Sequence, residues 1–106
     1  MVRKRVTFRG HVQGVGLRGT LSKYCLRRHV GGWMCNAPDS SLVVAELQGE
    51  SQSVDAVLRS VAAFFSNPAK SRGMLIEVVG EVEPVDGAEQ MHEVPWDGAL
   101  CDWQLD

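Results

Sequence analysis

The chain has 106 residues, of which 44% are hydrophobic and 23% are charged, a composition typical of an ordinary globular domain. Its length predicts a single domain over residues 1–106 with one core. The sequence contains no apolar run of the roughly 20 residues that cross a membrane, and the basic N-terminus lacks the apolar segment of a signal peptide. Three cysteines without C-x-x-C spacing argue against a disulfide framework and favour the reducing cytoplasm.

The net charge of −2 is unevenly distributed along the chain. Residues 1–38 carry eight Lys or Arg and no acid, whereas residues 39–106 carry three Lys or Arg and thirteen acids, so the two parts have charges of +8 and −10. A basic segment raises the question of nucleic acid. A fold that mixes both parts in one sheet would cancel much of this field, and the remaining local potential would attract small anions. We favour a fold in which the two sets of charges largely cancel and some positive potential remains around the loop. We predict no nucleic-acid partner.

The hydrophobic pattern predicts strands and helices in the following order. Residues 4–11 alternate as a strand, and residues 19–28 repeat apolar side chains at helical spacing. Residues 30–37 and 42–48 are two further strands, joined as a hairpin by a turn at residues 38–41. The three scattered histidines show no pairing at helical spacing, so no metal site is predicted.

The second half of the chain continues this pattern. A helix capped by Ser51 or Ser53 has the cleanest 3.6-residue periodicity, carried by Val54, Val57, Leu58, Val61, Ala62 and Phe65. Residues 75–82 form a fourth strand, 85–99 a long loop, and 100–105 a candidate short extra strand at the C-terminal edge. The order βαββαβ is that of a ferredoxin-like α/β sandwich in the α+β class, with an antiparallel sheet and two helices on one face.

The connection between the first strand and the first helix contains two glycines and reads Gln13-Gly14-Val15-Gly16-Leu17-Arg18. Glycines permit the positive φ angles that curl successive amides into an anion-binding nest, and the dipole of the following helix attracts anions. Arg18 offers a planar fork suited to phosphate oxygens. A cation at a helix start opposes the dipole, so a bound anion explains Arg18 better than a surface ion pair does. The loop is predicted to bind phosphate, although a tight connection without a ligand explains the glycines equally well.

Asn36 is the second candidate functional residue. In the predicted fold the strand over residues 30–37 lies close to the loop, and period-two alternation places Asn36 with Met34 on one face, opposite Trp33 and Cys35. The Asn36 side-chain oxygen can accept a hydrogen bond from water and align it for attack. The competing interpretation is that Asn36 starts the turn of the hairpin.

The sequence around the loop supplies no carboxylate, His–Ser pair or metal cluster for acid–base work. A leaving group that needs no protonation is therefore expected. A carboxylate, whose acid has a pKa of roughly 4, meets this requirement, which points to mixed carboxylic–phosphoric anhydrides as substrates.

Two segments, GHVQGVGLR at residues 10–18 and GWMCNAPD at residues 32–39, resemble the two signatures of the acylphosphatase family, roughly G-x-V-Q-G-V-G-[FY]-R and G-W-V-x-N. The resemblance covers about residues 4–80. It implies the ferredoxin-like fold and the hydrolysis of acyl phosphates without a cofactor or metal. It also implies that Arg18 binds phosphate, that Asn36 orients water, and that Gln13 and the loop backbone complete the cradle. The expected ligands are a small acyl phosphate and inorganic phosphate or sulfate, bound by a monomer without a membrane partner.

Four features depart from the family pattern. Leu17 replaces an aromatic residue, Ser40 stands where the hairpin turn prefers glycine, and the tail over residues 86–106 matches poorly. His29 replaces a helix-ending glycine, which costs roughly 1–2 kcal/mol if the residue is left-handed. These departures leave open a non-catalytic anion-binding or regulatory domain. An RNA-binding module of the same topology needs exposed aromatic residues on its middle strands, where only Phe8 is available.

Overall fold

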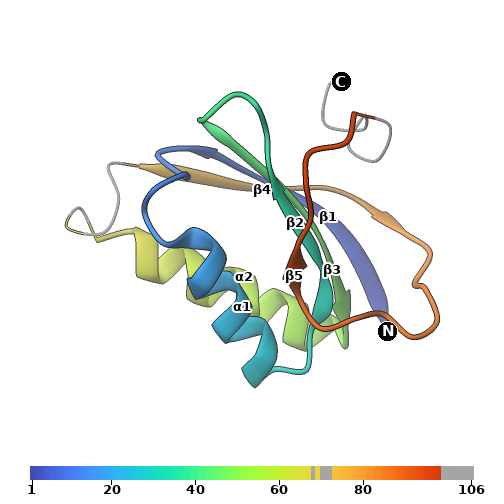
Figure 1. Ribbon diagram of the computed structural model, residues 1–106. Coiled ribbons are helices and arrows are strands. Elements are labelled where there is room, and N and C mark those ends of the chain that lie inside the picture. Colours follow the sequence, from blue (N-terminus) through green and yellow to red (C-terminus); the bar gives the residue numbers. More distant parts are fainter. Residues whose placement is uncertain (68, 70–72, 99–106) are drawn as a thin grey trace.

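The computed structural model describes residues 1–67, 69 and 73–98, and Figure 1 shows a twisted sheet with both helices on one face. The elements are β1 (Val2–Gly10), α1 (Leu17–Arg27), β2 (Gly31–Asn36), β3 (Leu42–Gly49), α2 (Ser51–Phe65), β4 (Met74–Val82) and β5 (His92–Glu93). The strand order is β4-β1-β3-β2-β5. Neighbouring strands among the first four pair antiparallel, and β5 pairs parallel with β2. The predicted ferredoxin-like βαββαβ fold is confirmed.

The first helix begins earlier than the sequence pattern predicts. It starts at Leu17 rather than near residue 19, because Gly16 caps it in the left-handed conformation (φ 83°) and turns the chain directly from the loop into the helix. The glycine loop and the helix N-terminus are therefore continuous. This continuity brings the loop amides and the unpaired amides of the first helical turn to the same place.

The second helix also starts differently from the prediction. Glu50 is its N-cap residue and no side chain caps it, so neither Ser51 nor Ser53 has the predicted capping role. Of the six predicted apolar positions, four are fully buried, Leu58 is half-buried and Ala62 is exposed. Burial of this apolar face holds α2 on the sheet without a cap.

The C-terminal part of the sheet corrects the predicted loop over residues 85–99. Residues 92–93 form β5, and Gln90 makes an isolated bridge to Gly31. Two residues are too few to show an alternating pattern, so this strand was not predictable from hydrophobic periodicity. The extra strand predicted over residues 100–105 lies outside the described residues.

Apolar clusters lie on both faces of the sheet. The larger one fills the space between the sheet and the helices and includes Met34 and Cys25, and the smaller one, on the opposite face, includes Trp33 and Cys35. This confirms the predicted alternation along β2. Cys25 and Cys35 are on opposite faces and cannot join in a disulfide. Burial raises the pKa of the Cys25 thiol to about 12, so Cys25 is a protonated packing residue at neutral pH.

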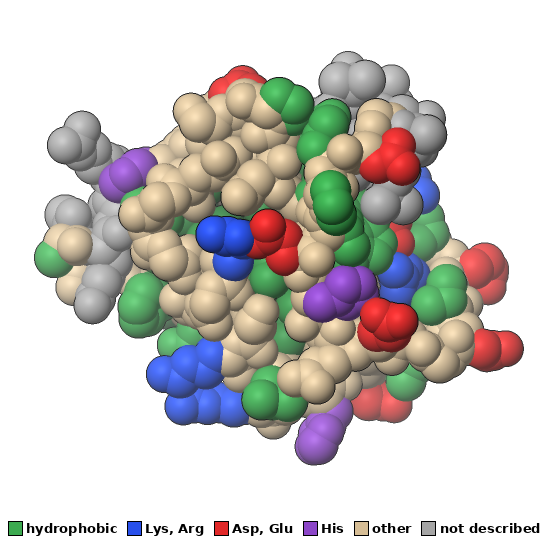
Figure 2. All heavy atoms as spheres, in the orientation of Figure 1, with side chains coloured by type: hydrophobic (Ala, Val, Ile, Leu, Met, Phe, Trp, Pro, Cys, Tyr) green, Lys and Arg blue, Asp and Glu red, His purple; other side chains and the backbone are tan. Residues whose placement is uncertain are grey.

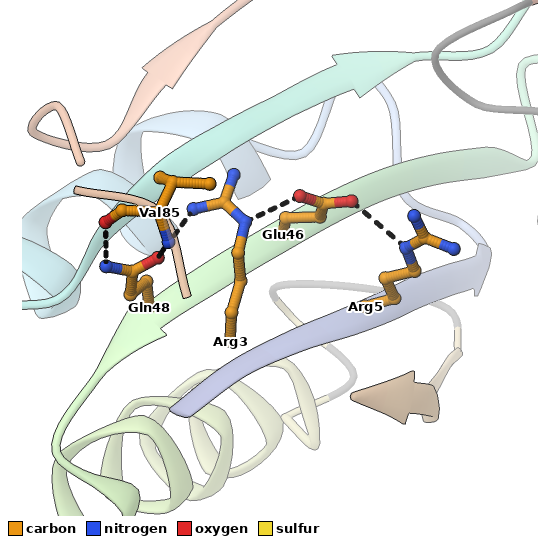
Figure 3. A network of polar contacts seen from close by, with 5 residues as sticks. All are labelled: Arg3, Arg5, Glu46, Gln48 and Val85. Carbon is orange, nitrogen blue, oxygen red and sulfur yellow. Dashed lines mark hydrogen bonds and ion pairs between the residues drawn. The ribbon is translucent and has the colours of Figure 1, made fainter. Parts of the chain in front are cut away.

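The two oppositely charged parts of the sequence meet in the fold. Arg3 and Arg5 both pair with Glu46, at Nε–Oε distances of 2.7 and 3.1 Å, and Lys4 pairs with Asp55 at 3.0 Å. Figure 3 shows the Glu46 carboxylate between the two guanidinium groups. On the face drawn in Figure 2 the basic side chains are scattered, and those near the centre adjoin acidic ones. The N-terminal basic residues are thus partly neutralised, as the sequence predicts.

The same polar network fastens the segment that leads to β5. The Gln48 amide donates to the Val85 carbonyl and accepts from the Val85 amide, both at 2.8 Å, while Arg3 donates to Gln48 Oε1 at 3.1 Å (Figure 3). Further on, the Gly32 N–H donates to the Glu89 carbonyl at 2.9 Å. A Cβ at Gly31 would lie 2.5 Å from the same carbonyl. The glycine at this position therefore lets the returning chain reach the edge of β2.

The helix α1 ends in a Schellman motif with His29 at the left-handed position. The Val30 N–H donates to the Cys25 carbonyl at 2.9 Å and the His29 N–H donates to the Leu26 carbonyl at 3.4 Å. His29 has a φ of 56°, a conformation that glycine adopts without steric penalty. The departure at His29 therefore carries the predicted conformational penalty.

Replacing His29 with glycine is expected to raise the free energy of unfolding by roughly 1 kcal/mol, because the left-handed penalty disappears. Urea denaturation of both proteins measures the change. Arg28→Gly is the matched control, since Arg28 has a φ of −108° and a glycine there only increases the entropy of the unfolded chain. Equal destabilisation by both substitutions would contradict this account of the helix end.

Candidate active site

The glycine loop and the start of α1 line one pocket of about 240 Å³, formed by Val12, Gln13, Gly14, Gly16, Leu17, Arg18, Gly19 and Asn36. Gly14 and Gly16 have φ angles of 78° and 83°, as the sequence predicts for a nest. A Cβ at either glycine would meet no atom within 4 Å, so these positions need glycine for its conformation and not for space. The loop therefore has the backbone shape that presents successive amides to an anion.

The N-terminus of α1 is open to this pocket. No side chain caps it and its first turn holds no acidic residue, although both features are common at helix starts. The first intrahelical bond runs from the Thr20 N–H to the Gly16 carbonyl at 3.0 Å. The preceding amides of the helix thus lack helical acceptors. An anion in the pocket would receive these hydrogen bonds and the favourable end of the helix dipole.

Arg18 lies on the pocket in the first turn of α1, and its side chain is 54% exposed. One guanidinium nitrogen, Nη1, pairs with Oε2 of Glu93 from β5. The sequence raised a surface ion pair as the alternative explanation for Arg18, and the structure contains that pair. A guanidinium has five N–H donors, so the contact leaves others for an anion in the pocket.

Gln13 connects the loop to the β2–β3 hairpin. Its side-chain amide nitrogen lies 3.1, 3.2 and 3.3 Å from the carbonyl oxygens of Ala37, Leu42 and Asp39, respectively. The side-chain donors of Gln13 are therefore directed at the hairpin, and its place in the predicted cradle rests on its backbone. This connection holds the glycine loop beside the end of β2, where Asn36 lies.

Asn36 is the last residue of β2 and faces the pocket. Its Oδ1 is buried and has no hydrogen-bond partner among the described residues. The turn that follows is formed by Asp39 instead, whose carboxylate accepts from the Ser41 N–H at 2.9 Å and the Ser41 hydroxyl at 2.7 Å. These bonds lower the pKa of Asp39. The interpretation of Asn36 as the residue that starts the turn is thus disfavoured.

The sequence model of the acylphosphatase family matches residues 4–87. The chain belongs to the acylphosphatase family. An acylphosphatase from Aeropyrum pernix is 34% identical over 94 residues, which are 89% of this chain and 88% of the relative. The crystal structure of an acylphosphatase from Bacillus subtilis matches with a TM-score of 0.70 and 24% identity, covering 89% of this chain and 99% of that one.

The fold of the acylphosphatase family also occurs as part of longer proteins. The chain matches full-length HypF in its phosphate- and nucleotide-bound form with a TM-score of 0.68 and 25% identity. The match covers 92% of this chain and 12% of the HypF chain.

Two loop residues, Leu17 and Val15, connect the glycine loop to the main core. Leu17, which replaces the family's aromatic residue, is only 2% exposed and joins the main core while also lining the pocket. Val15 packs against the same core and is absent from the pocket lining. The side chain of Val15 therefore anchors the loop, and only its backbone belongs to the predicted phosphate cradle.

Glu93 is the residue at this site that the sequence did not reveal. It is 75 positions from Arg18, and no carboxylate was expected near the loop. Val12 and Gly19 also line the pocket beyond the predicted set, and their adjacency to the motif could have indicated them. Among the described residues, no cluster of three or more His, Cys, Asp or Glu side chains could hold a metal ion. None of the described helices has both the length and the apolar character to cross a membrane.

Proposed function

We propose that this member of the acylphosphatase family hydrolyses the carboxyl–phosphate bond of acyl phosphates to a carboxylate and inorganic phosphate. One observation carries the proposal. Arg18 from α1 and Asn36 from β2 line the same pocket as the uncapped N-terminus of α1. The pocket thus combines donors for a phosphoryl group with an acceptor for water.

The phosphoryl group is held by the backbone N–H groups of residues 13–18 and by Arg18. Phosphoryl transfer passes through a loose transition state with negative charge spread over the equatorial oxygens. Fixed amides, the helix dipole and a guanidinium stabilise this charge without rearranging during the reaction. Inorganic phosphate and sulfate are ligands of the same cradle.

Asn36 orients the attacking water. A half-turn about the Cβ–Cγ bond exchanges the side-chain oxygen and nitrogen of Asn36 and turns the unpartnered acceptor toward the pocket. The bound water then forms the new bond to phosphorus in line with the departing acyl oxygen. The acyl oxygen leaves with the bonding electron pair as a carboxylate, and the protons of the water remain on phosphate or pass to solvent.

This chemistry restricts the leaving group. A carboxylate departs without protonation because its acid has a pKa of roughly 4, whereas an alkoxide needs a general acid. Purified protein should therefore hydrolyse benzoyl phosphate in the presence of a chelator, and should leave a simple alkyl phosphate intact under the same conditions. Phosphate release measures both rates. Phosphate binding without turnover would instead indicate the non-catalytic anion-binding domain.

We place residues 1–106 in one acylphosphatase-like domain that works as a monomer in the cytoplasm, without nucleic acid as a partner. The odd number of cysteines and the separation of Cys25 from Cys35 support a reducing compartment. Phe8, the aromatic residue that an RNA-binding module would need to expose, is fully buried in the main core.

A further inference from the structure

We infer that Glu93 is a positioning residue that acts through Arg18 as a built-in competing anion, which the phosphate group of the ligand must displace. This inference rests on the proposed role of Arg18 in phosphate binding. The ion pair joins the Arg18 Nη1 atom to a carboxylate oxygen of Glu93 at the edge of the pocket. The carboxylate therefore lies beside the site where another anion is to bind.

The pairing of β5 with β2 determines the direction of the Glu93 side chain. Met34 pairs with Glu93 in the parallel ladder, and the Val94 N–H donates to the Met34 carbonyl at 2.8 Å. Met34 and Met91 are both buried in the core on the helix side of the sheet, and side chains alternate along a strand. Glu93 therefore projects to the helix side, where Figure 1 shows β5 beside α1.

The other described residues around β5 do not line the pocket. Val94 and Trp96 pack against the smaller apolar cluster on the other face of the sheet, and His92 Nδ1 lies 2.9 Å from the Gln90 carbonyl. Neither Trp96 nor His92 covers the pocket. Of residues 91–96, Glu93 is the one that pairs with a residue of the site.

The charges around Arg18 determine whether Glu93 strengthens or weakens phosphate binding. Arg18 stands at the positive end of the helix dipole, where a cation gains from a nearby carboxylate. A bound phosphate supplies that negative charge itself and is repelled by Glu93. Both side chains are about half exposed, at 54% and 42%, so salt and solvent reduce the interaction to that of a surface pair. Glu93 should therefore weaken phosphate binding by a modest factor without blocking the site.

Titration of the full chain with inorganic phosphate tests this inference. Glu93→Gln should lower the Kd for phosphate by roughly two- to fivefold, and the gain should shrink as ionic strength rises. KM for benzoyl phosphate should fall by the same factor with kcat unchanged, because the competition affects bound substrate and transition state alike. A purely structural role of Glu93 would not produce this combination.

Two controls separate direct competition from a general change of charge. Glu89→Gln removes the same charge from the same segment, where the Glu89 carboxylate lies 3.6 Å from Nε2 of His92, and should alter the Kd by a smaller factor. In an Arg18→Ala background, Glu93→Gln should have little effect. A Kd that rises or stays constant in Glu93→Gln, or an equal effect of Glu89→Gln, overturns the inference. If Arg18→Ala binds phosphate as tightly as the wild type, the proposed phosphate site itself is wrong.

Discussion

Replacing Arg18 with alanine is expected to lower kcat/KM for benzoyl phosphate by roughly 10³-fold or more, the scale seen when an arginine that stabilises a transferring phosphoryl group is lost. Arg18 lies on the pocket at the start of α1, and the described first turn contains no other basic side chain. The remaining amides can still bind an anion, so the loss should be larger in kcat than in affinity. Steady-state hydrolysis and phosphate titration measure the two quantities.

Arg18→Lys is the informative companion variant. Lysine keeps the charge but replaces the planar fork with a single ammonium group, so it should recover part of the binding and little of the rate. The Arg18 side chain is half exposed, so neither substitution should prevent folding, and circular dichroism checks this. A folded Arg18→Ala protein with more than a tenth of wild-type kcat/KM would remove Arg18 from the reaction.

Replacing Asn36 with alanine is expected to lower kcat by roughly 10²–10³-fold, the cost of losing one preorganised polar group at a reacting centre. The Kd for inorganic phosphate should stay close to that of the wild type, because the role proposed for Asn36 is to orient the water and not to bind the phosphoryl group. The observation behind this separation is that Asn36 lines the pocket while its Oδ1 has no hydrogen-bond partner among the described residues. Steady-state hydrolysis measures kcat and phosphate titration measures the Kd, as for Arg18.

Cys35→Ala is the matched control for Asn36→Ala. Cys35 is the neighbouring residue of β2 and is fully buried in the cluster on the opposite face of the sheet. Its truncation should lower the free energy of unfolding and leave kcat near the wild-type value. An equal loss of kcat in both variants would mean that the Asn36 substitution acts by disturbing β2, and would remove its role in orienting water.

Local patterns made much of the site predictable. The positive φ angles of Gly14 and Gly16 follow from the placement of two glycines between a strand and a helix. Alternation along β2 was enough to separate Asn36 from Cys35, because period-two geometry holds wherever a strand has one face on the core. The conformational penalty at His29 was also predictable from local sequence, because the residue that follows the end of a helix commonly adopts the left-handed conformation.

Features that depend on distant contacts were not predictable. Glu93 reaches Arg18 only because Gly31 admits the returning chain and two residues pair with β2, and none of these contacts leaves a periodic signal. The start of α2 was misassigned because burial of its apolar face replaces a serine cap. The Gln13 side chain binds three carbonyls of the hairpin, a connection that depends on the fold and not on nearby sequence.

Hydrolysis of benzoyl phosphate in ¹⁸O-enriched water tests most directly whether the pocket directs water to phosphorus. In the proposed mechanism Arg18 and the loop hold the phosphoryl group and Asn36 aligns water with it, so label is expected in inorganic phosphate and none in benzoate. Mass spectrometry of both products, with the reaction lacking protein as the background, gives the result. Label in benzoate would show attack at the carbonyl carbon and would contradict the roles assigned to Arg18 and Asn36.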